Sequence, residues 1–100
     1  MFISEEFFMI KPYRDFKVCG NEEKKIRTFK RDHLKATDLV WHRDDEDRQI
    51  TVLFGSGWKF QRDNDIPVEL KHGDVFEVKK EEWHRIFKGN TDLVIEIKVL

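Results

Sequence analysis

Two residues of metal-ligating type, His42 and Asp44, lie two positions apart in a segment whose pattern predicts a strand, Asp38–Asp44. Residues i and i+2 of a strand point to the same face, so the imidazole and the carboxylate could meet one ion. A second interpretation stays open, because Asp44 also begins the acidic run Asp44–Asp47. Acidic side chains in such loops commonly accept backbone N–H bonds and keep their carboxylates in water.

The elements that must position these residues are predicted to be strands. Period-2 alternation, rich in β-branched and aromatic residues, recurs after residue 12 and is typical of an antiparallel sandwich or barrel. Two runs of helix formers, Asn21–Lys25 and Lys79–Glu82, are shorter than the ~12 residues an isolated helix needs, so we expect loops there. The predicted strands are Tyr13–Val18, Lys25–Lys30, Asp38–Asp44, Gln49–Phe54, Trp58–Gln61, Pro67–Leu70, Val75–Val78, Trp83–Lys88 and Leu93–Val99.

Composition restricts the classes of protein to which the chain can belong. Its 100 residues fit one domain, and 19 Lys and Arg against 20 Asp and Glu leave a net charge of −1. With neither a basic surplus nor an uncharged apolar run of membrane-spanning length, we expect no nucleic-acid partner and no membrane partner. The lone Cys19 can form no intrachain disulfide, which fits a reducing compartment, and we expect a cytoplasmic protein.

Two segments of the chain resemble the sequence motifs of the cupin superfamily. The first runs from His42 to Gly57 and ends in a strand followed by Gly55-Ser56-Gly57, and the second runs from Gly73-Asp74 to His84. The similarity extends over residues 38–99 and keeps the spacing of both motifs. It implies an all-β fold, a small double-stranded β-helix or jelly-roll barrel over residues 13–100, preceded by an N-terminal segment, residues 1–12.

The chain departs from the usual cupin side chains at four positions. Asp44 stands where a second His is usual, and Gln49 stands where a Glu is usual. Lys79 and Glu81 replace the usual Pro and Gly. Because a neutral amide at position 49 removes one negative charge, we expect weak binding of a divalent metal, or none.

The resemblance places Gln49 and His84 beside His42 in the mouth of the barrel. Two imidazoles and one carboxylate, from His42, Asp44 and His84, are the ligand set of a facial triad for Fe(II), which Mn(II), Zn(II) or Ni(II) could also use. The alternative is that both histidines are only hydrogen-bonded strand residues. The spacing by itself does not decide between these interpretations.

Two functions follow from the resemblance. One is a metal-dependent dioxygenase or isomerase acting on a small molecule, and the other is a metal-free module that binds a ligand or a partner without catalysis. In the enzyme, we expect Gln49 to orient the substrate or dioxygen by hydrogen bonding, and in the module we expect the ligand to contact Trp58, Phe60, Gln49 and His84. Arg48 either reaches over the opening or pairs with the acidic run. The remaining tryptophans, Trp41 and Trp83, are expected in the core or the pocket wall.

The first ten residues are unusually apolar for a small barrel to bury alone. We expect a homodimer in which residues 1–12 pack on a second subunit or add a strand to it. The alternative is a flap over the chain's own barrel. The large apolar side chains are Phe2, Ile3, Phe7, Phe8, Met9 and Ile10.

Overall fold

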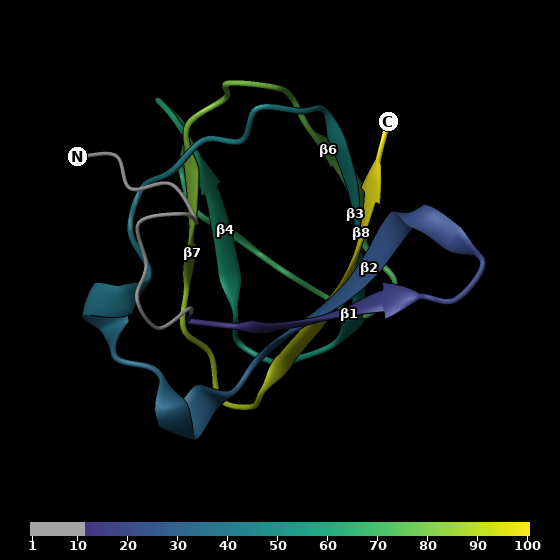
Figure 1. The fold of residues 1–100 in the computed structure, drawn as a ribbon. Helices are drawn as coiled ribbons and strands as arrows, with labels where there is room; N and C mark the ends of the chain where they lie inside the picture. The colour runs from purple at the N-terminus through teal and green to yellow at the C-terminus, as the bar shows by residue number, and fades with distance from the viewer. Residues whose placement is uncertain (1–11) are drawn as a thin grey trace.

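The computed structural model describes residues 12–100 and is nearly all β (Figure 1). Two short 3-10 helices, η2 (Arg31–His33) and η3 (Ala36–Asp38), follow the second strand. No helix among residues 12–100 is long and apolar enough to cross a membrane. The strands are β1 (Arg14–Val18), β2 (Asn21–Phe29), β3 (Arg48–Phe54), β4 (Lys59–Arg62), β5 (Val68–Glu69), β6 (Val75–Val78), β7 (His84–Phe87) and β8 (Leu93–Val99).

The strands form two antiparallel sheets. The larger has the order β1-β2-β8-β3-β6, and the smaller has the order β5-β4-β7. Figure 1 shows the smaller sheet on the left, facing the larger sheet on the right. The space between the two sheets is where the core and the candidate site lie.

The core follows from the alternation of the two longest inner strands. Leu93, Ile95 and Ile97 of β8 are buried, whereas the residues between them are partly exposed. Ile50 and Val52 of β3 are buried beside them, in register with Ile97 and Ile95. This packing fixes which face of β3 points inward.

Two local predictions from the sequence are wrong. Asp38–Asp44 is not a strand: Asp38 ends η3 and accepts a hydrogen bond from the backbone N–H of Lys35 (2.8 Å), and the segment pairs only at an isolated bridge. Asn21–Lys25 is not a loop, because Gly20, with φ of 77°, turns the chain tightly enough for pairing to resume at Val18 and Asn21. Glycine adopts this left-handed conformation without the steric cost that other residues incur.

The predicted N-terminal segment lies almost wholly outside the described residues. Of residues 1–12, the structure describes only Pro12. The expected homodimer and its alternative, a flap, therefore stay predictions.

Gly89 allows a test of the packing around Trp58. A Cβ at this position would overlap the carbonyl oxygen of Ser56 and the backbone nitrogen of Trp58. We expect Gly89→Ala to lower the free energy of unfolding by about 3 kcal/mol, since overpacking against rigid backbone costs this much. Gly20→Ala is the control, because its Cβ would meet nothing within 4 Å and only the left-handed backbone costs, about 1 kcal/mol. Urea denaturation of both variants measures the difference, and equal losses would contradict the packing.

Candidate metal centre

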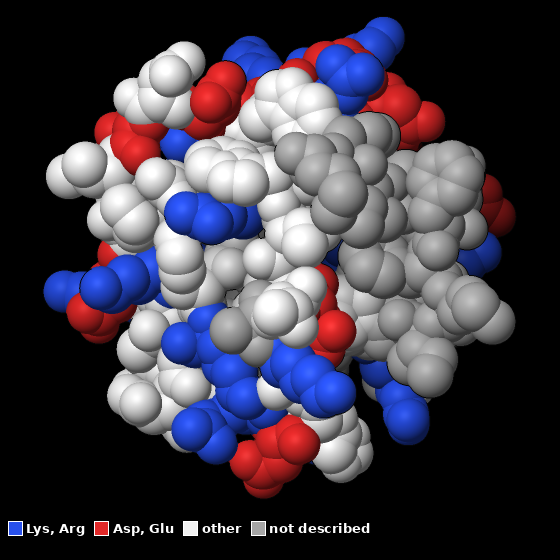
Figure 2. All heavy atoms as spheres, turned by 90° about the vertical axis from the view of Figure 1, so that its left-hand side faces the viewer, with Lys and Arg blue, Asp and Glu red and all other residues white. Residues whose placement is uncertain are grey.

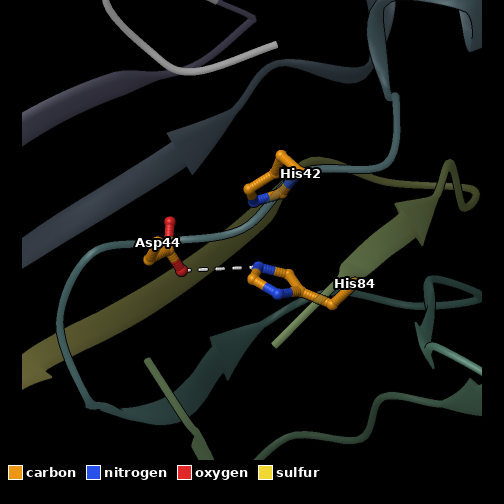
Figure 3. Close-up of side chains that lie close together, drawn as sticks. All are labelled: His42, Asp44 and His84. Atoms are coloured by element: carbon orange, nitrogen blue, oxygen red, sulfur yellow. Dashed lines mark ion pairs between the residues drawn. The ribbon is translucent and has the colours of Figure 1, made fainter. Parts of the chain in front are cut away.

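The backbones of His42 and His84 are joined by a pair of hydrogen bonds. Each backbone N–H donates to the other residue's carbonyl oxygen, both at 2.9 Å. This bridge sets the two imidazoles side by side, with ring centroids 4.2 Å apart. Asp44 follows two residues after His42, and Figure 3 shows all three side chains directed toward a common space. Their potential ligand atoms lie within 4.8 Å of one another.

Both imidazoles are oriented by backbone carbonyl groups. Nδ1 of His42 lies 3.2 Å from the carbonyl oxygen of Val40, and Nδ1 of His84 lies 2.8 Å from that of Glu82. Because a carbonyl oxygen only accepts, each ring is assigned its proton on Nδ1 and a lone pair on Nε2. Metal-binding histidines are commonly held in this way by a partner of the second ring nitrogen.

Asp44 completes a group of three hydrogen-bond acceptors. Its Oδ2 lies 3.5 Å from Nε2 of His84, the pair marked in Figure 3. Ligand atoms around one ion with bonds of about 2.1 Å lie roughly 3–3.5 Å apart, so this separation is close to that of a shared ion. Three acceptors that face one another repel unless a cation or a proton lies among them. The donor set therefore fits a divalent cation.

The His84 ring does not take up a proton at neutral pH. Burial lowers the pKa of His84 to about 4, and His42 and Arg48 act in the same direction, while the Asp44 carboxylate opposes them. The His84 ring is consequently neutral at pH 7. Neutral imidazole is the form that binds metals.

The structure places Arg48, not Gln49, on the inner face of β3. Arg48 is buried and lines the cavity, and its Nη1 lies 3.3 Å from Oδ1 of Asp44. Gln49 pairs across the sheet with Lys98 and Glu77 and does not line the cavity, so the predicted inward position of Gln49 is wrong. Successive side chains of a strand point to opposite faces, so the burial of Ile50 and Val52 turns residue 49 outward.

The three acceptors lie at the polar end of a cavity of about 90 Å³. Its wall is predominantly apolar, and Phe60 and Phe76 are in tilted contact there, with ring centroids 4.9 Å apart. The Phe60 ring also lies 5.6 Å from that of His84, so Phe60 joins the apolar wall to the polar end. A small molecule in this cavity would meet potential metal ligands at one end and mostly aliphatic or aromatic carbon elsewhere, with Arg27 and Asp38 as further charged residues of the lining.

Trp58 is buried outside the cavity and does not line it, so the prediction that it contacts a ligand is wrong. It is 0% exposed, and its Nε1 donates to the carbonyl oxygen of Thr91 at 2.7 Å. The ring also packs against Phe29, at a centroid distance of 5.9 Å. Trp58 and Phe60 do share a face of the chain, but Thr91 and Phe29 fill the space around the indole.

The other two tryptophans lie outside the cavity. Trp41 packs under the guanidinium of Arg85 (4.7 Å), and Trp83 packs under that of Arg43 (5.1 Å). Figure 2 shows the side of the molecule that carries the smaller sheet, where Lys and Arg side chains gather among uncharged ones. The expected place of these two tryptophans in the core or pocket wall is therefore wrong.

Arg27 lines the cavity and was not singled out by its sequence context. It is buried, and its guanidinium is held by Asp15 through two hydrogen bonds of 2.8 and 3.0 Å. The same group lies 3.5 Å from the centre of the Tyr13 ring. Its alternation with Phe29, which is also buried, is the signal that could have placed Arg27 inside.

Comparisons with known proteins identify the architecture. No protein-family model matches the chain, and no curated protein sequence matches it. A cupin-2 domain protein from Shewanella frigidimarina superposes with a TM-score of 0.61 at 14% identity, covering 87% of this chain and 80% of that one. An RmlC-like cupin with a double-stranded β-helix fold, from Methanocaldococcus jannaschii, gives 0.58 at 16% identity over 91% and 83%. The chain has the cupin fold.

Cupin-fold structures similar to this chain include one with iron. The structure of Fe(II)-HppE with the alternative substrate (S)-1-HPP has a TM-score of 0.56 at 12% identity, covering 96% of this chain and 62% of that one. The resemblance read from residues 38–99 is thus confirmed at the level of the cupin fold.

The low pKa of His84 predicts an acid-sensitive metal-free protein. An unfolded His binds its proton near pH 6.5 and the folded His84 near pH 4, so the unfolded state binds more protons between these values. Stability therefore falls as the pH falls through this range, by up to about 3 kcal/mol. Urea denaturation in chelator at pH 7, 5.5 and 4.5 measures the slope. His84→Gln should flatten it and the exposed His72→Gln should not, whereas equal slopes in all three proteins would contradict the assignment.

The outward position of Gln49 gives a test of the register. Gln49→Glu should change the free energy of unfolding by less than ~0.5 kcal/mol, as surface substitutions usually do, and should leave Mn(II) affinity within about twofold. Thermal melts with and without Mn(II) provide the measurement. An increase in melting temperature that requires both Mn(II) and the new carboxylate would place residue 49 inside the cavity.

Proposed function

We propose that this cupin-fold chain binds one divalent metal ion through His42, Asp44 and His84, and that a small molecule reacts in the adjoining cavity. The observation that carries the proposal is the convergence of two imidazole lone pairs and one carboxylate oxygen at the polar end of an apolar cavity. Two histidines and one carboxylate are the ligand set of non-haem Fe(II) enzymes. We therefore favour Fe(II) over Mn(II), Zn(II) and Ni(II), and a dioxygenase or isomerase reaction.

The residues of the site have separate tasks in this proposal. The carbonyl groups of Val40 and Glu82 hold the two imidazoles with Nε2 toward the site. Arg48 holds Oδ1 of Asp44, which leaves Oδ2 directed to the ion position. The apolar wall holds the substrate body and excludes water. The ion, when bound, supplies Lewis-acid or one-electron chemistry.

A second candidate function is a metal-free module that binds a small molecule. It is favoured by the ion pair between Arg48 and Asp44, which neutralises the only carboxylate among the described residues that is buried in the cavity. Both candidates are proposed for a cytoplasmic protein, because the exposed thiol of Cys19 suits a reducing compartment.

Calorimetric titration of chelator-treated protein decides between the two functions. We expect one ion per chain, with anaerobic Fe(II) tested beside Mn(II), Zn(II) and Ni(II). His84→Ala and Asp44→Asn should each weaken binding at least about 100-fold, because the first removes a ligand atom and the second replaces a charged ligand oxygen with a neutral amide. His72→Ala, an exposed histidine, is the matched control and should bind as wild type does. Heats that are equal in wild type and His84→Ala would sink the metal proposal and leave the metal-free module.

A further inference from the structure

The buried polar end of the cavity is poor in negative charge. Among residues 12–100, the buried charged or ionisable side chains are Arg27, Asp44, Arg48 and His84, and an imidazole that ligates a metal carries no charge. The two carboxylate oxygens of Asp44 contact different groups: Oδ1 lies 3.3 Å from Nη1 of Arg48, and Oδ2 lies 3.5 Å from Nε2 of His84. One carboxylate would therefore serve both a guanidinium and a metal ion.

Binding of a divalent ion would leave this end with an excess of positive charge. Arg48 and Asp44 cancel, so the full double charge of the ion would remain. Glu46 accepts a hydrogen bond from Nε of Arg48 (2.9 Å), but its side chain is 34% exposed and its charge is partly screened by water. Asp38 also lines the cavity and is likewise partly exposed, so among the described residues these two screened carboxylates would offset the charge of the ion only in part. Uncompensated charge in a buried site is costly, so an anionic ligand would be favoured.

The remainder of the cavity sets the size and polarity of such a ligand. A water position needs ~10–15 Å³ of space, so a cavity of about 90 Å³ has room for roughly six to nine non-hydrogen atoms. Arg27 also lines the cavity, but its guanidinium is already paired with Asp15. The wall near the polar end otherwise consists of aliphatic and aromatic side chains, which would not compensate a second charged group. These side chains are Ile50, Phe60, Phe76, Val78, Ile86 and Ile97.

We propose that the ligand of this cavity is a small monocarboxylate with a branched aliphatic or aromatic body. Its carboxylate lies between Arg48 and the ion position, and its body lies against the apolar wall. A guanidinium suits this position because its planar N–H groups match the geometry of a carboxylate. The inference rests on the proposed metal function, because the excess positive charge arises when the ion binds. The ion and the carboxylate must then strengthen each other's binding by the same factor.

The experiment measures this coupling without requiring catalysis. Chelator-treated full chain is titrated with Co(II), followed by visible absorption and calorimetry, in the presence of 3-methylbutanoate or of its neutral isostere 3-methylbutanamide. The carboxylate should lower the Kd of Co(II) at least about tenfold, and the amide less than about twofold. Acetate has the charge without the body and succinate carries a second charge, so each should have less than about a threefold effect. Acetate also controls for complexation of Co(II) in solution.

Two variants test the role of Arg48. Arg48→Met removes the guanidinium, so it should bind Co(II) more tightly than wild type without ligand and gain less than about threefold from 3-methylbutanoate. Arg85→Met, the same change on the outer face of β7, should keep the wild-type response. Melting temperatures check that both variants fold, and the ligand series on wild type is decisive by itself if Arg48→Met does not fold.

The outcomes separate the two proposals. If Co(II) binds with loss in His84→Ala but with equal affinity in 3-methylbutanoate and 3-methylbutanamide, the monocarboxylate inference is overturned and the metal function stands. An equal effect of acetate and 3-methylbutanoate would also overturn it, because the apolar wall would then contribute nothing. Absence of Co(II) binding under every condition overturns the metal function and this inference with it.

Discussion

The backbone bridge between His42 and His84 is the constraint on which the site depends. The chain between η3 and β3 has no regular strand pairing, and three backbone hydrogen bonds of 2.8–2.9 Å attach it to the start of β7 and the turn before it. Two of these bonds join His42 and His84, and the third runs from the N–H of Glu81 to the carbonyl oxygen of Asp44. A mutual pair of bonds fixes two residues directly opposite each other, so both imidazoles must enter the same space. If this segment shifted by one residue, a neighbour of His42 would face His84 instead, and the three side chains would no longer converge.

The arrangement so obtained is electrostatically unfavourable by itself. Two imidazole lone pairs and a carboxylate oxygen face one another there, and the low pKa of His84 keeps that ring unprotonated at neutral pH. Arg48 compensates only one oxygen of Asp44. Without a cation this group of acceptors lowers the stability of the fold, because side chains placed to suit a cation repel one another when none is present. Functional sites commonly violate the rules that the rest of a fold obeys.

The sequence predicts the fold better than it predicts the orientation of the site. Alternation in Leu93–Val99 and the glycine-containing turns are local signals, and both survive folding because they depend on near neighbours. Alternation also shows that residues 49 and 51 share a face, but which face is inward depends on pairing with β8, distant in sequence. For that reason the motif spacing identifies His42, Asp44 and His84 but assigns Gln49 to the interior in place of Arg48. The irregular segment before β3 explains this wrong assignment, because it lets the strand begin with either its odd-numbered or its even-numbered residues facing inward.

The two buried arginines of the cavity show why only one of them belongs to the candidate site. Arg27 makes a two-bond fork with the carboxylate of Asp15 and packs over Tyr13, so an anionic partner holds its guanidinium in fixed geometry. Arg48 instead contacts two different carboxylates, those of Asp44 and of the part-exposed Glu46. A fork committed to one carboxylate is a structural pair, whereas a guanidinium that shares its carboxylate with an ion position is coupled to whatever that position holds. Strand β3 thus contributes a cation at the position where a carboxylate would strengthen a metal centre, and Asp44 is the buried carboxylate among the described residues that opposes it.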